Sequence, residues 1–114
     1  MKNQLKVNIM GTDYTLANES SEINPKMKDA AGLCEVYSKR IIIDTSPKNY
    51  EDTVENFDDF CHRALRHEGF HALFHEVGLT EYYEDETLVE MLAILYPRIK
   101  KIMDTLDNID VDKI

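Results

Sequence analysis

The chain is poor in cysteine and has no long apolar run. Its 114 residues contain two cysteines, Cys34 and Cys61, and no Cys-x-x-Cys pair, which excludes a zinc knuckle built on cysteines. We expect both thiols to be free and buried rather than joined in a disulfide. No stretch is long enough to span a membrane, and the opening MKNQLKVNIMGTDY lacks the apolar run of a signal peptide. These absences predict a cytoplasmic protein without a membrane partner.

Positive charge is also scarce. Thirteen Lys and Arg residues stand against 22 Asp and Glu residues, for a net charge of −9. Such a balance repels phosphate backbones, so direct binding to nucleic acid is not expected. Acidic blocks such as YEDTVENFDDF are typical of a solvated face. They leave open a second hypothesis, in which the chain imitates nucleic acid and occupies the basic groove of another protein.

The first half of the chain has the pattern of strands. QLKVNIMGTDYTLAN alternates apolar and polar residues, which predicts a hairpin with Gly11 in its turn. GLCEVYSKRIIIDT predicts two more strands around a turn at Ser38 and Lys39, with 41–43 the most buried. SSEINPKMKDA, interrupted by Pro25, is expected to be a loop or a short helix. Residues 1–50 are therefore expected to be mainly strands of a small, mostly antiparallel sheet.

The second half has the pattern of helices. From about Asp52, apolar residues and histidines recur every three or four positions in one stripe that we expect to face the core, namely Phe57, Phe60, Ala64, His67, His71 and Phe74. Gly78 is expected to end this helix. A second helix is expected from about Asp85, with a kink or a new segment at Pro97. The chain is thus predicted to be one α+β domain, 1–114, with helices mainly in 52–107 and a frayed tail at 108–114.

Within the first predicted helix lies the stretch RHEGFHALFHEVGL. His67 and His71 are one helical turn apart, so their imidazoles share a face and can converge on one zinc ion. Glu68 is turned about 100° round the helix, where it can face a water at an open position of the metal as a general base. The alternative is that both histidines are hydrogen-bonded residues of the core.

A zinc site of this kind needs a third protein ligand. His75 is about 12 Å along the helix from His67, too far for one ion to join both. The second predicted helix contains ETLVE, with Glu86 and Glu90 one turn apart. We expect Glu86 to be the third ligand and Glu90 to accept a hydrogen bond from the outer nitrogen of a ligand histidine. The reverse assignment, with Glu90 on zinc, remains open.

HEGFH followed by ETLVE resembles the HExxH…ExxxD pattern of gluzincin metallopeptidases. The stretch from Arg66 to Ile99 is similar to small phage and prophage zincin-like proteins related to the ImmA/IrrE group. The resemblance implies a minimal zincin-like fold, with the sheet packed on the HExxH helix and the following C-terminal helix. It also implies His67, His71 and Glu86 as zinc ligands and Glu68 as the catalytic base. The sequence departs from the pattern at Glu90, where the family usually has Asp, and at Gly69 inside the motif.

These residues predict a zinc-dependent metallopeptidase that hydrolyses a peptide bond in a protein partner. The anionic intermediate needs a hydrogen-bond donor, for which the candidates are Tyr82, Tyr83, His75 and Arg98. A peptide substrate would lie along a strand edge between Gly32 and Thr45. The alternative function is a non-catalytic phage or prophage binding or inhibitor protein, in which zinc is structural or absent.

Overall fold

A four-stranded sheet forms the base of the molecule. The computed structural model describes residues 5–46 and 56–114. The strands are β1 (Leu5–Ile9), β2 (Thr12–Asn18), β3 (Gly32–Glu35) and β4 (Arg40–Ile43), in the order β1-β2-β4-β3. Both outer pairs are antiparallel, whereas β2 and β4 run parallel. The α+β class is confirmed. The sheet is mixed because the chain passes from β2 to the far edge strand β3 and then returns through β4, which pairs with β2 in parallel.

The predicted turns lie where the sequence placed them. Met10 and Gly11 both have positive φ, 51° and 94°, as a two-residue hairpin turn between β1 and β2 requires. Lys39, at φ 59°, closes the turn between β3 and β4. The stretch around Pro25 forms a single 3-10 turn, η1 (Pro25–Met27), whose Met27 is fully buried.

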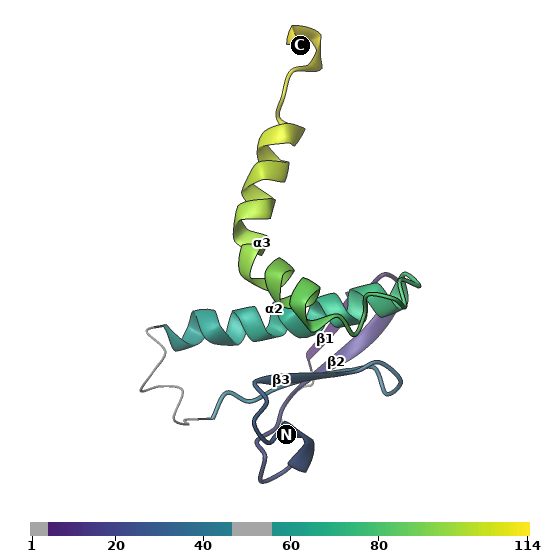
Figure 1. Cartoon of the computed structure of the whole chain (residues 1–114), viewed down its shortest axis with the longest axis vertical. Helices are drawn as coiled ribbons and strands as arrows, with labels where there is room; N and C mark the ends of the chain where they lie inside the picture. Colours follow the sequence, from purple (N-terminus) through teal and green to yellow (C-terminus); the bar gives the residue numbers. More distant parts are fainter. Residues whose placement is uncertain (1–4, 47–55) are drawn as a thin grey trace.

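Helix α2 (Phe57–Glu76) lies over one face of the sheet (Figure 1). The predicted start near Asp52 falls outside the described residues, and the described helix begins after Asn56, whose side chain accepts a hydrogen bond from the amide of Asp59. Its end is the predicted one. Gly78, at φ 79°, follows the last turn, and the amides of Gly78 and Leu79 donate to the carbonyls of His75 and Phe74. This pairing is that of a Schellman motif.

The face that α2 turns to the sheet differs from the predicted stripe. Ala72 is fully buried against Tyr14 and Ile41, and Glu68 is buried one turn before it. The helix is therefore rotated by about one residue, or about 100°, from the predicted orientation. Small Ala72 allows a close approach to the strands. The rotation moves His67 toward the neighbouring helix.

Helix α3 (Glu86–Asp107) crosses α2 and then leaves the body of the molecule as a projecting arm (Figure 1). Val89 and Ala93 are fully buried where the helices cross. Pro97 does not begin a new segment, since the helix runs through it. Proline cannot donate to the carbonyl four residues earlier, and the freed carbonyl of Ala93 instead accepts a hydrogen bond of 2.9 Å from Arg66 Nε on α2.

The end of the chain is exposed. After Asn108 it forms one 3-10 turn, η2 (Val111–Lys113). Every residue from Lys100 to Ile114 is exposed. Both cysteines are free, as predicted, but each is half-buried rather than buried. No helix among residues 5–46 and 56–114 is both long enough and apolar enough to cross a membrane.

Candidate metal centre

Three potential ligand atoms meet where α3 begins beside the middle of α2. The Nε2 atoms of His67 and His71 are 3.2 Å apart. The two carboxylate oxygens of Glu86 lie 2.8 Å from His67 Nε2 and 3.0 Å from His71 Nε2. Asp85 sets the position of Glu86, because its side chain caps α3 by accepting a hydrogen bond from the amide of Leu88. The structure thus brings together the three residues that were predicted from the sequence as zinc ligands.

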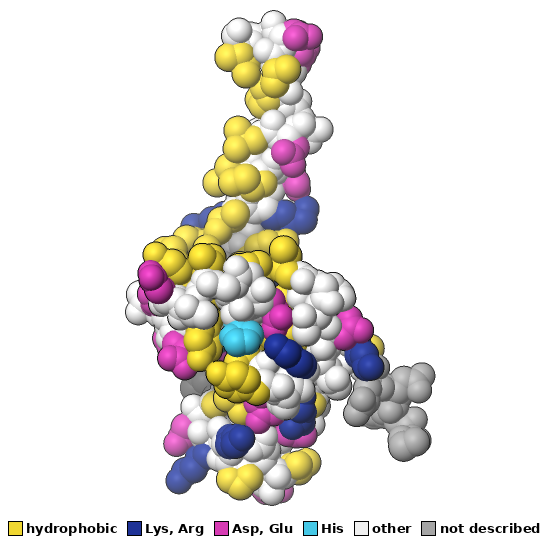
Figure 2. All heavy atoms as spheres, turned by 90° about the vertical axis from the view of Figure 1, so that its right-hand side faces the viewer, with side chains coloured by type: hydrophobic (Ala, Val, Ile, Leu, Met, Phe, Trp, Pro, Cys, Tyr) yellow, Lys and Arg dark blue, Asp and Glu magenta, His cyan; other side chains and the backbone are white. Residues whose placement is uncertain are grey.

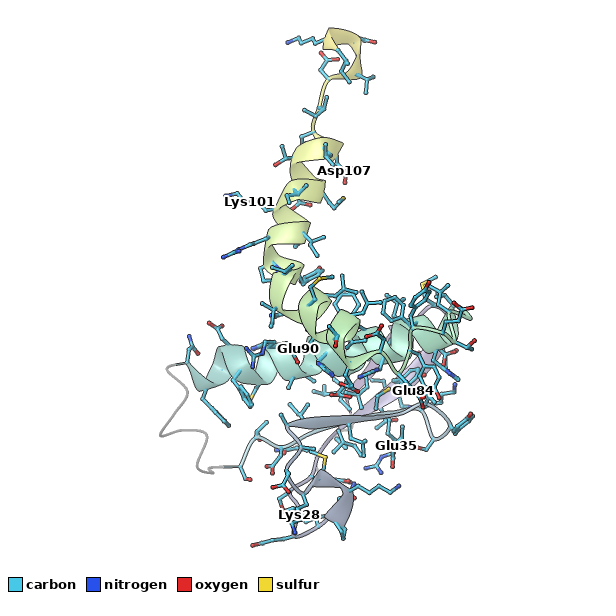
Figure 3. The ribbon with its side chains drawn as sticks, in the orientation of Figure 1. Lys28, Glu35, Glu84, Glu90, Lys101 and Asp107 are labelled. Carbon is cyan, nitrogen blue, oxygen red and sulfur yellow. The ribbon has the colours of Figure 1, made fainter. Side chains whose placement is uncertain are left out.

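The outer nitrogen of each histidine has its own acceptor. His67 Nδ1 lies 2.8 Å from a carboxylate oxygen of Glu90 (Figure 3 labels Glu90 where α3 crosses α2). His71 Nδ1 pairs with the backbone carbonyl of Tyr83. Acceptors at these positions hold the ring proton on Nδ1 and leave the lone pair on Nε2. Glu90 therefore orients a histidine, while Glu86 lies with the inner nitrogens.

This donor set is suited to a cation. With both ring protons on Nδ1, the two Nε2 atoms and the Glu86 carboxylate are all acceptors, and acceptors in contact repel one another unless a cation or added protons join them. Tetrahedral zinc with bonds of 2.0–2.1 Å keeps its ligands about 3.3 Å apart. The spacing of 2.8 to 3.2 Å in the cluster is close to that value. Two imidazoles and one carboxylate also match the ligand types of catalytic zinc sites.

Glu68 is next to this cluster but is not part of it. Its Oε2 lies 4.0 Å from His67 Nε2, and its side chain is 9% exposed. It points toward the edge strand β3, where Gly32 makes room for it. A Cβ built at Gly32 would be 2.9 Å from Glu68 Cγ and 3.0 Å from Oε2, which is closer than real Cβ contacts allow. A glycine at this strand position is thus required by the buried carboxylate.

Burial and charge both act on the ionisable groups here. Burial raises the pKa of Glu68 to about 7, and the carboxylates of Glu86 and Glu90 add to the effect against the opposing influence of His67. Burial alone would lower the pKa of His67, but Glu68, Glu86 and Glu90 together raise it. Burial, followed by the charge of Glu68, raises the pKa of Cys34 to about 12. Cys34 therefore stays a neutral thiol and does not compete as a ligand.

A pocket of about 290 Å³ opens beside the cluster. Its walls are the edge strand β3 with the two residues before it, and the facing sides of α2 and α3. His67, Glu68, Glu86 and Glu90 line it, and so does Arg63, one turn before His67 on α2. Arg63 Nε lies 3.4 Å from a carboxylate oxygen of Glu90. Arg63 is the one Lys or Arg among the described residues that line this pocket.

The predicted transition-state donors lie elsewhere. His75 packs its ring against Tyr37 and Tyr83, with centroids 5.9 and 5.4 Å away. The hydroxyl of Tyr83 donates to Glu84, and Tyr82 packs on Phe74. None of these side chains lines the pocket in the described part of the chain.

Arg98, the fourth candidate donor, is twelve residues beyond Glu86 on α3, or about 18 Å along the axis. It is exposed on the outer part of the helix. On geometry, Arg63 is the better placed cation.

No family model, no curated protein and no solved structure matches the chain.

Sequence reasoning missed three contributors to this site. Arg63 had a detectable signal, because it precedes His67 by four residues and so shares its face of the helix. Gly32 also had one, since a glycine at the start of a strand often marks a close approach of another group. The carbonyl of Tyr83 had none, because a backbone acceptor depends on how the loop between the helices folds.

Proposed function

We propose that the protein is a zinc-dependent metallopeptidase. The observation that carries the proposal is the convergence of three acceptors, His67 Nε2, His71 Nε2 and the Glu86 carboxylate, beside the buried carboxylate of Glu68. A set of three ligands leaves one coordination position for water or substrate, as hydrolytic zinc sites do. The pocket on this side of the cluster gives a substrate room to approach.

His67, His71 and Glu86 would hold the ion, and bound zinc would supply an acidified water and polarise a carbonyl group. Glu68 would take the proton of that water and deliver it to the leaving amine. Its surroundings suit a proton carrier, because burial keeps its pKa near 7 rather than near the usual value for a carboxyl group. A bound cation would lower this pKa and favour the proton-accepting form.

Glu90 and Arg63 have supporting roles in this proposal. Glu90 holds the tautomer and orientation of His67 through Nδ1. Arg63 lies beside Glu90 and lines the pocket, so its guanidinium is positioned to stabilise negative charge that develops on a substrate oxygen.

The edge strand supports a peptide as the substrate. β3 is the last strand of the sheet and pairs only with β4 among the described strands, so its outer edge can pair with an added strand. Gly32 and Leu33 of β3 also line the pocket. An extended peptide bound along this edge would pass the metal ligands, with main-chain hydrogen bonds to β3 supplying affinity.

The test begins with capture of a substrate. Glu68→Gln protein loaded with zinc is used to trap binding proteins, and each captured protein is then incubated with wild-type protein, with and without a chelator. We expect zinc-dependent cleavage by the wild type and none by His67→Ala, which should also lose its zinc. Cleavage that persists in the chelator, or equal cleavage by wild type and Glu68→Gln, would refute the proposal.

The main competing function is a binding protein in which zinc only joins α2 to α3. A structural site is normally closed by four protein ligands. Two further acids lie near the cluster, but Glu90 pairs with the outer nitrogen of His67, and the oxygen of Glu68 is 4.0 Å from His67 Nε2. This separation favours an open site. X-ray absorption of the zinc-loaded protein would distinguish the two, since the proposal requires three protein ligands and a water.

A further inference from the structure

The outer part of α3 carries an apolar stripe that the body does not cover. Ile102, Met103 and Leu106 are 55%, 51% and 57% exposed. Figure 2 shows hydrophobic side chains following one side of the projecting arm from the body toward its tip. A continuous band of exposed apolar side chains favours association with another surface. A helix that is only solvated would carry polar residues at these positions.

The stripe has the spacing of a coiled-coil seam. Its apolar residues alternate steps of four and three along α3 and just past its end: Leu88, Leu92, Leu95, Ile99, Ile102, Leu106 and Ile109. In a heptad these are successive d and a positions. The first four are half-buried near the body, whereas the last three are exposed. The seam therefore continues beyond the part of α3 that packs against the body of the molecule.

Charges on the arm are separated by sign along its length. Arg98, Lys100 and Lys101 form a basic segment immediately after Pro97. An acidic segment follows, with Asp104, Asp107, Asp110 and Asp112 ahead of the single cation Lys113 (Figure 3 labels Lys101 and Asp107 on the arm). One ion pair within the arm joins Lys100 to Asp104 at 2.8 Å. Among the described residues no other ion pair holds the charges of these two segments, so they are available to a second helix.

We propose that the arm pairs with the arm of a second copy of this chain in antiparallel orientation. Reversing one arm places its acidic segment beside the basic segment of the other, whereas a parallel pair would bring like charges together. The seam is self-complementary in this orientation, because Ile102 of each copy lies opposite Leu106 of the other copy. The two bodies then lie at opposite ends of the paired arms, which leaves both metal centres accessible. This inference does not depend on the proposed function.

Sedimentation equilibrium of the full chain tests the proposal. We expect a monomer–dimer equilibrium with a dissociation constant on the order of 10 µM, since the exposed seam is short. Leu106→Glu should weaken dimerisation by roughly 100-fold, because it places an unpaired charge in the seam. Ile23→Glu is the matched control, since Ile23 is 71% exposed on the body and should leave the dimer unchanged. Circular dichroism should show that both variants remain folded.

Disulfide cross-linking tests the orientation. Ile102→Cys and Leu106→Cys proteins are mixed, oxidised and digested, and the linked peptides are identified by mass, with the wild-type chain as the background for Cys34 and Cys61. The antiparallel pair should link position 102 to position 106 between copies. Links of 102 to 102 and of 106 to 106 would indicate a parallel pair and overturn the orientation.

Two results would overturn dimerisation itself. One is a monomer at all concentrations up to about 1 mM, which would assign the stripe to a different protein. The other is a dimer that Leu106→Glu does not weaken, which would place the contact elsewhere on the molecule. High salt should weaken the antiparallel dimer, because part of its attraction is between exposed charges.

Discussion

Glu68 and Glu76 occupy the same face of the same helix in opposite environments. Both lie on the side of α2 that faces the sheet, two turns apart. Glu76 accepts hydrogen bonds from Thr12, Tyr14 and Lys39 at 2.9, 2.6 and 2.7 Å, and Lys39 followed by Tyr14 lowers its pKa to about 2. Glu68 is buried over Gly32 beside other carboxylates, and its pKa is raised to about 7.

The contrast separates a structural carboxylate from a reactive one. Donors from β2 and from the turn between β3 and β4 satisfy Glu76, so its charge fixes the C-terminal half of α2 to the sheet. Glu68 has a close-packed position but no comparable set of donors within residues 5–46 and 56–114, so its negative charge is poorly stabilised without a nearby cation. A buried acid in that condition is costly to keep, and such acids are concentrated at functional sites.

The largest expected effect comes from making the two glutamates neutral in turn. Glu68→Gln should reduce turnover by roughly 10²–10⁴-fold, because it removes the proton acceptor and keeps the shape. Glu76→Gln should reduce turnover by less than about tenfold, since Glu76 does not line the pocket. The measurement is single-turnover cleavage of a captured substrate, with zinc content of each protein as the control. Equal losses in the two variants would show that fold stability, rather than proton transfer, limits the reaction.

Gly32→Ala should come next in size. The added methyl group would be 2.9 Å from Glu68 Cγ, so either the carboxylate or β3 must move. We expect turnover to fall by about 10- to 100-fold, because a displaced general base works poorly, and the free energy of unfolding to fall by about 1–3 kcal/mol from overpacking.

Gly32→Ala in the Glu68→Ala background is the control. Removing the carboxylate should relieve the clash, so the second substitution should destabilise this background much less than it destabilises the wild type. Chemical denaturation of the four proteins gives the coupling. Additive losses would mean that Gly32 is needed for a reason other than Glu68.

Glu76→Gln should affect stability and its dependence on pH. An amide cannot accept from Thr12, Tyr14 and Lys39 as a carboxylate does, so the free energy of unfolding should fall by about 1–3 kcal/mol at pH 7. The folded pKa of Glu76, about 2, lies below the usual value of about 4.3. Its charge therefore stabilises the fold above pH 4.3, and this contribution is lost as the pH falls toward 2.

Urea denaturation of the zinc-free proteins between pH 2 and 7 checks this sign. The difference between wild type and Glu76→Gln should be constant above about pH 5 and shrink below about pH 4. A difference that grows on acidification would contradict the assigned pKa. In zinc-free protein Glu68 should act oppositely, because a raised folded pKa favours the neutral form and costs stability as the pH rises from about 4.3 to 7.

The turns and helix ends of this structure were predictable from the sequence wherever a single residue type determines the local conformation. The hairpin turn at Gly11, the helix end at Gly78 and the start of α3 at Asp85 each follow from the conformation or capping that one residue type favours. The grouping of His67 and His71 followed from helical spacing alone.

Features that depend on packing were not predictable in the same way. The stripe of α2 was assigned to the core through His67 and His71, because histidines and phenylalanines dominate the pattern. The structure instead uses Ala72 and the acid Glu68 on the sheet side, and hydrophobic periodicity cannot anticipate a buried carboxylate. At Pro97 the helix continues because Arg66, on another helix, bonds the carbonyl that proline leaves free. Such compensation depends on contacts far apart in sequence.

The smallest expected effect concerns Gly69, next to Glu68 in the motif. A Cβ at Gly69 meets nothing within 4 Å, in contrast to Gly32, so no close approach within the described chain explains this glycine. It lines an apolar pocket between α2 and the β1–β2 hairpin, on a different side of the helix from the metal cluster. Gly69→Ala should raise the free energy of unfolding by about 0.5–1 kcal/mol, because alanine loses less backbone freedom in a helix. Zinc content and turnover should not change. If turnover falls while stability rises, the bare backbone at Gly69 is needed for the approach of a substrate, and the pocket beside it becomes part of the active site.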